Sequence, residues 1–114
     1  MGRERRRHPR AVVDWPALVQ DSNGSIVAEM ENISANGACI RCEKPLRPKE
    51  RFKLHMVAPD HSPLTARAEV AWLQVCRSEK DIPACGMGIR FTRASRVVRQ
   101  FIQSFVAAQH QRNK

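Results

Sequence analysis

The segment Arg51-Phe52-Lys53-Leu54-His55-Met56-Val57 alternates between apolar and polar side chains along its length. In an extended chain, its Phe, Leu and Met side chains fall on one face, and its Lys and His side chains fall on the other. Period-two alternation over this length is typical of a β-strand with one buried face. The segment therefore predicts a half-buried strand, which must pair with other strands of the same chain.

Further segments with strand character lie on both sides of it, separated by turn residues. Residues 21–24 read Asp-Ser-Asn-Gly and predict a hairpin, because an Asn-Gly pair favours two-residue hairpin loops. Pro16 predicts an edge strand or a bulge, since proline cannot donate to a ladder of hydrogen bonds. The other predicted strands cover residues 11–19, 25–31, 38–42, 64–77 and 84–91.

Alternation also orients the last two strands. In residues 64–77 the side chains predicted to share one face are Ala66, Ala68, Val70 and Trp72. In residues 84–91 the predicted inward side chains are Met87, Ile89 and Phe91. Gly86 and Gly88 leave the opposite face of this strand without side chains.

The C-terminal part of the chain follows a different period. In residues 95–109 apolar side chains recur at helical spacing and form one stripe, with Thr92 or Ser95 as the capping residue. The residues of the stripe are Val97, Val98, Phe101, Ile102, Phe105 and Val106. Six short strands followed by one helix predict an all-β fold with a C-terminal helix, namely a six-stranded antiparallel β-barrel with the helix packed against it.

Composition limits the class of protein. A chain of 114 residues forms one domain, and its net charge of +9 indicates anionic partners such as nucleotides, nucleic acids or acidic membrane surfaces. No apolar run approaches the roughly 20 residues that a membrane-spanning helix needs. The charged N-terminus has no apolar segment behind it, so it does not resemble a secretory signal. These features predict a cytoplasmic protein.

The four cysteines raise the possibility of a metal site. Cys39 and Cys42 form a CxxC pair, which Cys76 and Cys85 could complete as a zinc set. However, residues 39–42 are predicted to be a strand, in which side chains three apart point to opposite faces and cannot share a metal ion. We therefore expect no metal and interpret the cysteines as reduced thiols in the core or on the surface.

The first ten residues, Met-Gly-Arg-Glu-Arg-Arg-Arg-His-Pro-Arg, contain five arginines and one acidic residue. A guanidinium group is always charged, and its planar fork of donors suits phosphate groups and the Hoogsteen edge of guanine. A second polar stretch, Asn32-Ile33-Ser34-Ala35-Asn36-Gly37, ends in a glycine that permits a positive φ. By itself the first stretch is typical of a disordered basic tail.

These two stretches resemble the two motifs of PilZ domains. Arg6-Arg7-His8-Pro9-Arg10 resembles the RxxxR motif, and residues 32–37 resemble the (D/N)xSxxG motif. Ala68-Glu69-Val70-Ala71-Trp72 and residues 86–91 look like later strands of that family. The resemblance covers nearly the whole chain, and it implies a bacterial receptor for the second messenger cyclic di-GMP, built on a small barrel with a C-terminal helix.

The resemblance also implies a set of ligand-binding residues. Arg6 and Arg10 are the motif arginines, and Asn32 and Ser34 would bind a guanine edge or hold an arginine in place. Gly37 would shape the backbone. Trp72 lies where some family members place an aromatic ring near the base, but the sequence leaves a core position equally open. The full candidate set is Arg5, Arg6, Arg7, Arg10, Asn32, Ser34, Gly37 and Trp72.

The residue before RxxxR bears on stoichiometry. In the family, an apolar residue there goes with one bound molecule and an arginine goes with a stacked pair. Here the position holds Arg5, so two cyclic di-GMP molecules per domain are expected. Residues 1–10 would be a flexible arm that the ligand orders, residues 11–110 the barrel with its helix, and residues 111–114 a tail. The reordered surface would signal to an effector protein that the sequence does not identify.

Other classes of function fit less well. The four histidines are scattered and no nucleophile elbow surrounds Ser34, so a binding module is expected rather than an enzyme. A basic nucleic-acid-binding barrel is the main alternative. It is disfavoured because the chain has only two Trp, four Phe and no Tyr, whereas platforms for single strands use several aromatic side chains. A scaffold whose basic helix binds a partner or an acidic membrane is a third possibility.

Overall fold

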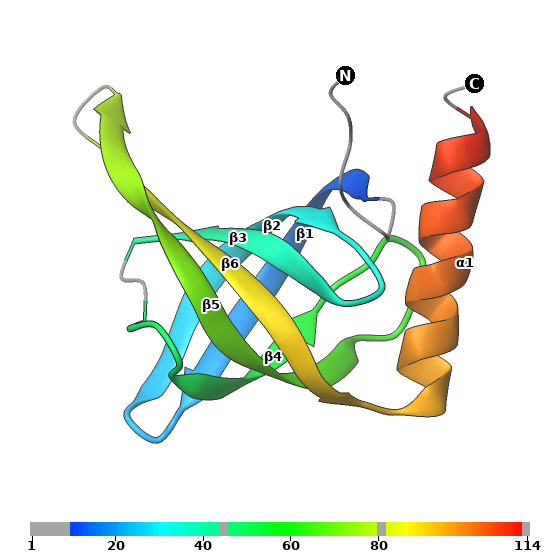
Figure 1. Ribbon diagram of the computed structural model, residues 1–114, viewed down its shortest axis with the longest axis horizontal. Helices are drawn as coiled ribbons and strands as arrows, with labels where there is room; N and C mark the ends of the chain where they lie inside the picture. The colour runs from blue at the N-terminus through cyan, green and yellow to red at the C-terminus, as the bar shows by residue number, and fades with distance from the viewer. Residues whose placement is uncertain (1–9, 44–45, 80–81, 113–114) are drawn as a thin grey trace.

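The computed structural model describes residues 10–43, 46–79 and 82–112, and these form a closed barrel flanked by one helix (Figure 1). The barrel order is β1-β2-β3-β6-β5-β4, and every neighbouring pair is antiparallel. The predicted six-stranded antiparallel barrel with a C-terminal helix is therefore confirmed. The elements are β1 Ala11–Asp21, β2 Gly24–Ile33, β3 Gly37–Cys42, β4 Arg51–Met56, β5 Leu64–Glu79, β6 Ile82–Ala94 and α1 Arg96–Arg112.

Strand β1 closes the barrel because it pairs with β2 on one side and with β4 on the other. The edge-strand alternative for Pro16 is therefore wrong, and the bulge alternative is confirmed by a register shift between Val12 and Trp15. The predicted hairpin turn is also present. The carboxylate of Asp21 accepts a hydrogen bond from the backbone N–H of Asn23 at 2.8 Å, and Gly24 adopts a φ of 135°.

The inward-facing side chains of the strands fill the barrel and form its core. The half-buried strand predicted from residues 51–57 is β4, whose Phe52, Leu54 and Met56 are all buried. The predicted inward positions Ala66, Ala68 and Val70 of β5 are also buried. Trp72 departs from this pattern, because the pairing of β5 with β6 shifts register between Val70 and Trp72. That shift turns the indole outward, where it is 44% exposed, so the core position for Trp72 is wrong.

The helix begins where the sequence predicts it. Ser95 caps α1, because its hydroxyl accepts a hydrogen bond from the N–H of Val98 at 3.2 Å. Val98, Ile102 and Val106 are buried, and Phe101 and Phe105 pack on Trp15 with ring centroids 6.3 and 5.0 Å apart. The apolar stripe therefore joins the helix to β1. No helix among the described residues is long and apolar enough to cross a membrane.

Candidate functional site

Two of the predicted ligand residues, Asn32 and Trp72, lie in one line on the outer surface of the barrel. Residues directly opposite each other on β1, β2, β3, β6 and β5 form this line, which we call the site row. It consists of Val12, Asn32, Cys39, Gly88 and Trp72. Residues 40 positions apart in the chain, such as Asn32 and Trp72, are thus joined by consecutive steps across one sheet surface.

Asn32 reaches the outer surface through an irregularity in β2. The register of β2 against β3 shifts between Met30 and Asn32, and the next residue, Ile33, points into the core. The side-chain oxygen Oδ1 of Asn32 is buried and accepts no hydrogen bond from the described part of the chain. A buried polar atom without a partner costs free energy, which a ligand or side chain that donates a hydrogen bond would recover.

Arg10 lies beside the middle of the site row. Its Nη1 approaches the sulfur of Cys39 at 3.5 Å, and the side chain is exposed. A thiol is a weak acceptor, so this contact leaves most of the donor capacity of the guanidinium group free for an anion. The other predicted arginines, Arg5, Arg6 and Arg7, lie outside the described residues.

Cys39 and Cys42 occupy β3, which confirms that the CxxC segment is a strand. Cys39 belongs to the site row on the outer face of β3, and Cys42 is buried on the opposite face. The side chains of Cys76 and Cys85 are outside the described part. Within that part, no group of three residues is placed to hold a metal ion.

Trp72 and Gly88 form the end of the site row. A Cβ atom at Gly88 would lie 2.0 to 2.4 Å from three atoms of the indole ring, so the ring occupies the space above a residue that has no side chain. The indole therefore lies close against the sheet and keeps an exposed part. The sequence identified the bare glycine face, but not the fact that Trp72 occupies it.

Ser34 and Gly37 build the turn between β2 and β3, beside the row members Asn32 and Cys39. The Ser34 hydroxyl donates to the carbonyl oxygen of Gly37 at 3.2 Å and accepts from the N–H groups of Asn36 and Gly37. Its hydrogen bonds are therefore committed within the turn. Gly37 does not adopt the positive φ that a glycine permits. A Cβ there would lie 2.1 Å from the carbonyl oxygen of Ile89, so the glycine allows close approach of β3 and β6.

The neighbouring surface of β1, β2 and β3 is acidic and internally paired. Arg41 bridges Glu29 and Glu31, with an Nη1–Oε2 distance of 2.6 Å to the latter. A hydrogen bond between Asp14 and Glu29 raises the pKa of Asp14 and lowers that of Glu29. The hydrogen bond from Arg41 to Glu29 raises the pKa of Arg41. Arg41 is therefore neutralised, and Arg10 is the cation available beside the row among the described residues.

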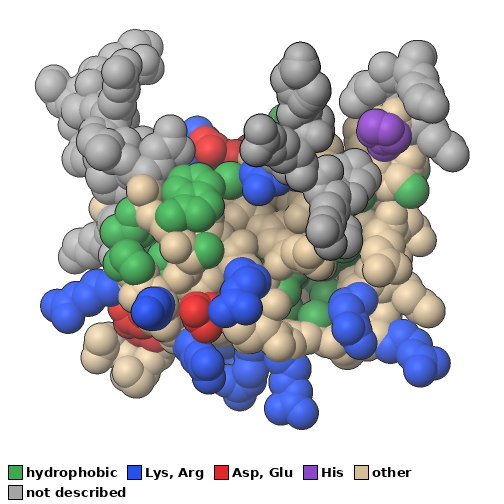
Figure 2. Space-filling model, in the orientation of Figure 1, with side chains coloured by type: hydrophobic (Ala, Val, Ile, Leu, Met, Phe, Trp, Pro, Cys, Tyr) green, Lys and Arg blue, Asp and Glu red, His purple; other side chains and the backbone are tan. Residues whose placement is uncertain are grey.

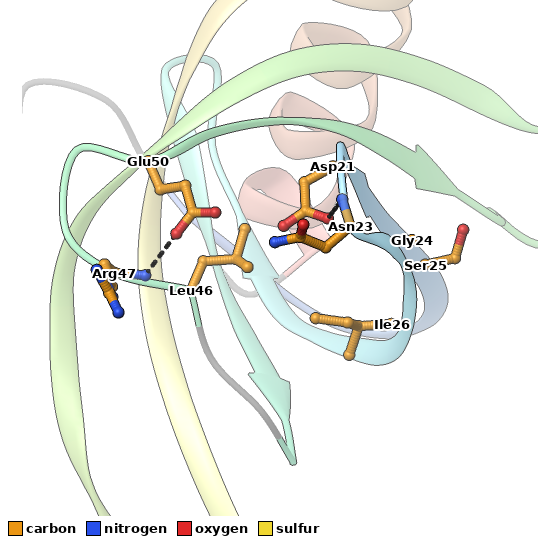
Figure 3. A pocket seen from close by; sticks show the side chains of 8 residues that line it. All are labelled: Asp21, Asn23, Gly24, Ser25, Ile26, Leu46, Arg47 and Glu50. Carbon is orange, nitrogen blue, oxygen red and sulfur yellow. Dashed lines mark hydrogen bonds between the residues drawn. The ribbon is translucent and has the colours of Figure 1, made fainter.

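A cavity of about 530 Å³ lies elsewhere on the barrel (Figure 3). It lies between the β1–β2 hairpin and residues 46–50, and no predicted site residue lines it. Its carboxylates are those of Asp21 and Glu50, which accept hydrogen bonds from the N–H groups of Asn23 and Arg47. Its lining holds two carboxylates and one cation, that of Arg47, so it has no net positive charge to attract an anionic dinucleotide.

An outer-surface row with an exposed indole and a buried amide oxygen, beside the guanidinium group of Arg10, combines groups that suit a planar, anionic ligand. Comparison with known proteins identifies the family to which this domain belongs. The PilZ domain family matches residues 4–108, so the chain belongs to this family. No curated protein matches it in sequence.

Solved structures share its fold at low sequence identity. The PilZ domain of YcgR from Escherichia coli, solved with c-di-GMP, is 14% identical with a TM-score of 0.78, and the match covers 96% of this chain and 95% of that domain. The inhibitor of motility MotI/DgrA of Bacillus subtilis is 16% identical with a TM-score of 0.78, and the match covers 97% of this chain. The MrkH–c-di-GMP complex of K. pneumonia is also 16% identical, with a TM-score of 0.78 and 97% coverage. This chain spans 53% of the MotI chain and 56% of the MrkH chain.

Proposed function

We propose that this chain is a receptor for cyclic di-GMP and binds it on the site row. The observation that carries the proposal is the unpartnered, buried Oδ1 of Asn32 in a row that also holds Trp72 and lies beside Arg10. Membership of the PilZ family supports it, as do the two relatives of the same fold that were solved with this dinucleotide.

The chemistry of the ligand matches the groups in the row. Cyclic di-GMP has two phosphates and two guanines. Arg10, together with Arg6 of the same motif, would donate charge-assisted hydrogen bonds to phosphate oxygens or to guanine O6 and N7, each worth about 1.5–3 kcal/mol. Asn32 Oδ1 would accept an N–H from guanine or from a motif arginine. The exposed face of Trp72 would stack on a base.

Ser34 and Gly37 would act through the backbone. The hydroxyl of Ser34 holds the turn, and Gly37 sets the approach of β3 to β6, so both residues would fix the position of Asn32 and Cys39. We therefore assign them a positioning role in the proposed site rather than a contact with the ligand.

The proposed mechanism is a ligand-induced change of surface in a binding module without catalytic activity. Residues 1–10 act as a flexible arm that cyclic di-GMP orders against the barrel formed by residues 11–110, with 111–114 as a tail. Arg5 and Arg7 add the charge for a second, stacked dinucleotide. The reordered surface then presents itself to an effector protein.

Isothermal titration of the full chain with cyclic di-GMP tests the proposal. We expect saturable binding, no comparable heat from GTP or cyclic GMP, and intact dinucleotide after long incubation. Absence of heat at moderate salt would contradict the receptor function. Appearance of linear dinucleotide would contradict the assignment as a binding module.

A further inference from the structure

A second surface of the barrel carries like charges directly opposite each other. Lys53 on β4 is the direct partner of Arg67 on β5, and Arg67 is the direct partner of Arg93 on β6. Neighbouring strands lie about 4.8 Å apart, and like charges in directly opposite positions destabilise a sheet. We call these three residues the basic row.

The adjacent row shows how such repulsion is relieved elsewhere on the same strands. There, Glu69 lies between Arg51 and Arg90 and pairs with both, at 3.4 and 3.2 Å. No ion pair among the described residues includes a member of the basic row. The three positive charges of the basic row therefore have no carboxylate partner among the described residues, unlike the arginines of the adjacent row.

The start of α1 extends this positive surface. Arg96 and Arg99 lie at the start of the helix, and its first turn contains no acidic residue. Cations near a helix N-terminus are unfavourable, because the helix dipole is positive at that end. Arg93 and Arg99 line one cavity of about 340 Å³ together with Asn36, so the basic row and the helix form one continuous surface. We define Lys53, Arg67, Arg93, Arg96 and Arg99 as the basic face.

The space-filling view shows that basic side chains gather on this part of the molecule. Lys and Arg side chains lie along the lower part of the face in Figure 2, over the region where β5, β6 and α1 meet in Figure 1. The acidic cluster of Asp14, Glu29 and Glu31 belongs to β1 and β2 instead. The basic face and this acidic cluster thus lie on different parts of the barrel surface, an arrangement that steers an acidic partner toward the basic face.

We propose that the basic face is a docking surface for an acidic surface of a partner protein. Two features of the face favour a protein over other polyanions. Val97, 68% exposed beside Arg96, gives it an apolar contact inside a charged rim, as in protein interfaces. Trp72 is the one aromatic side chain among the exposed large apolar residues of the described part, and it belongs to the site row. The basic face therefore offers no stacking platform for single-stranded nucleic acid.

The helix also argues against a membrane as the occupant. A helix that lies on a membrane presents large apolar or aromatic side chains to the lipid. In α1 the aromatic side chains Phe101 and Phe105 pack on Trp15 of β1, and Val97 is the one large apolar side chain that the described helix exposes. A single valine supplies too little apolar area for insertion.

The docking surface is separate from the site row, so the two proposals fail independently. Along β6 the site row includes Gly88 and the basic row includes Arg93. Arg90, which pairs with Glu69, lies between them. The test is therefore made without dinucleotide. A short fluorescein-labelled poly-L-glutamate peptide serves as the probe of an acidic protein surface, and its anisotropy is measured with the full chain at low and physiological salt.

The test compares two double variants with equal loss of charge. Arg67→Gln/Arg93→Gln removes two members of the basic row. Arg47→Gln/Lys49→Gln instead removes two exposed cations from the loop before β4, which form no ion pair with any other described residue. We expect the first variant to weaken peptide binding about tenfold and the second less than about twofold, with binding that falls as salt rises. Unfolding of the first variant by urea should require the same or a higher concentration, because cross-strand repulsion is removed.

Three results would overturn the proposal. Equal weakening by both variants would mean a diffuse effect of net charge. Binding of duplex DNA or of phosphatidylglycerol vesicles, with no binding of poly-L-glutamate, would mean a different occupant. A lower stability of Arg67→Gln/Arg93→Gln would mean that the basic row stabilises the sheet rather than serving a partner.

Discussion

At the residue scale, Gly88 is the position where a single atom decides the shape of the proposed site. A Cβ there would collide with the indole of Trp72, which is the flexible partner because it is 44% exposed. We expect Gly88→Ala to displace the ring and to weaken cyclic di-GMP binding about tenfold, since base stacking on an aromatic ring is worth about 1–3 kcal/mol. Titration calorimetry measures the change.

A double-mutant cycle separates this effect from general damage to the barrel. In a Trp72→Ala background, Gly88→Ala should have no further effect on affinity, because the ring that it displaces is already absent. The free energy of unfolding of Gly88→Ala should change by less than about 1 kcal/mol, as for substitutions that surface groups accommodate. Additive losses in the cycle would contradict the assigned role of Trp72.

Arg10 and Arg41 offer a second comparison, because one is free and the other is held by two carboxylates. Loss of a charge-assisted contact worth about 1.5–3 kcal/mol predicts that Arg10→Ala, like Arg6→Ala, weakens cyclic di-GMP binding at least tenfold. Arg41→Ala and Arg3→Ala remove the same charge and should change affinity less than about threefold. Similar losses in all four variants would indicate diffuse attraction and would favour the nucleic-acid alternative.

The sequence could select single residues as candidates where a motif contains them. It could not orient their side chains where an irregularity of the backbone decides the orientation. Asn32 was singled out as a candidate by its motif, and its unpaired oxygen was found only in the structure. Trp72 could not be oriented, because the register shift after Val70 leaves no mark in the alternation of residue types. For Gly37, the sequence indicated only that a positive φ is permitted, whereas the requirement for glycine comes from a backbone oxygen on another strand.

At the scale of elements, the contact between β3 and β6 depends on Gly37. A Cβ at this position would lie 2.1 Å from the carbonyl oxygen of Ile89, and backbone cannot move aside as a side chain can. We expect Gly37→Ala to lower the free energy of unfolding by about 1–3 kcal/mol, as overpacking does. Chemical denaturation gives the value. Asn36→Ala, an exposed position in the same turn, is the control and should change stability by less than about 0.5 kcal/mol. Equal effects of the two substitutions would contradict this explanation.

The elements themselves were predictable because each one has a consistent period. Alternation located three of the strands, strand-forming residues between turns located the other three, and the apolar stripe of α1 located the helix. The strands extend beyond the predicted segments, as in β5, which continues to Glu79, and β6, which continues to Ala94. Polar residues at strand ends are held by pairing with a neighbour, and that pairing is a property of the fold rather than of the local sequence.

At the scale of the whole molecule, the net charge of +9 is unevenly distributed, and the arm holds a large share of it. The fold brings Arg10 to the site row at one end of this arm, so the arginines that precede it are tethered near any ligand bound there. A short tether raises the effective concentration of these groups at the site. The number of phosphates that can be bound should therefore depend on the composition of the arm.

Arg5 is the residue for which this dependence is most specific. A second, stacked cyclic di-GMP brings two more negative charges next to the first, and it is repelled unless an additional guanidinium group offsets them. Arg5 would supply that group and would also lie flat on a guanine. We expect a titration endpoint of two dinucleotides per chain for the unmodified protein and of one for Arg5→Leu. Arg3→Leu, with the same change of charge outside the motif, should keep an endpoint of two. Sedimentation of the saturated complex distinguishes two ligands on one chain from a ligand-bridged dimer. An endpoint of one for the unmodified chain would contradict the role of Arg5, and it would leave the receptor proposal intact.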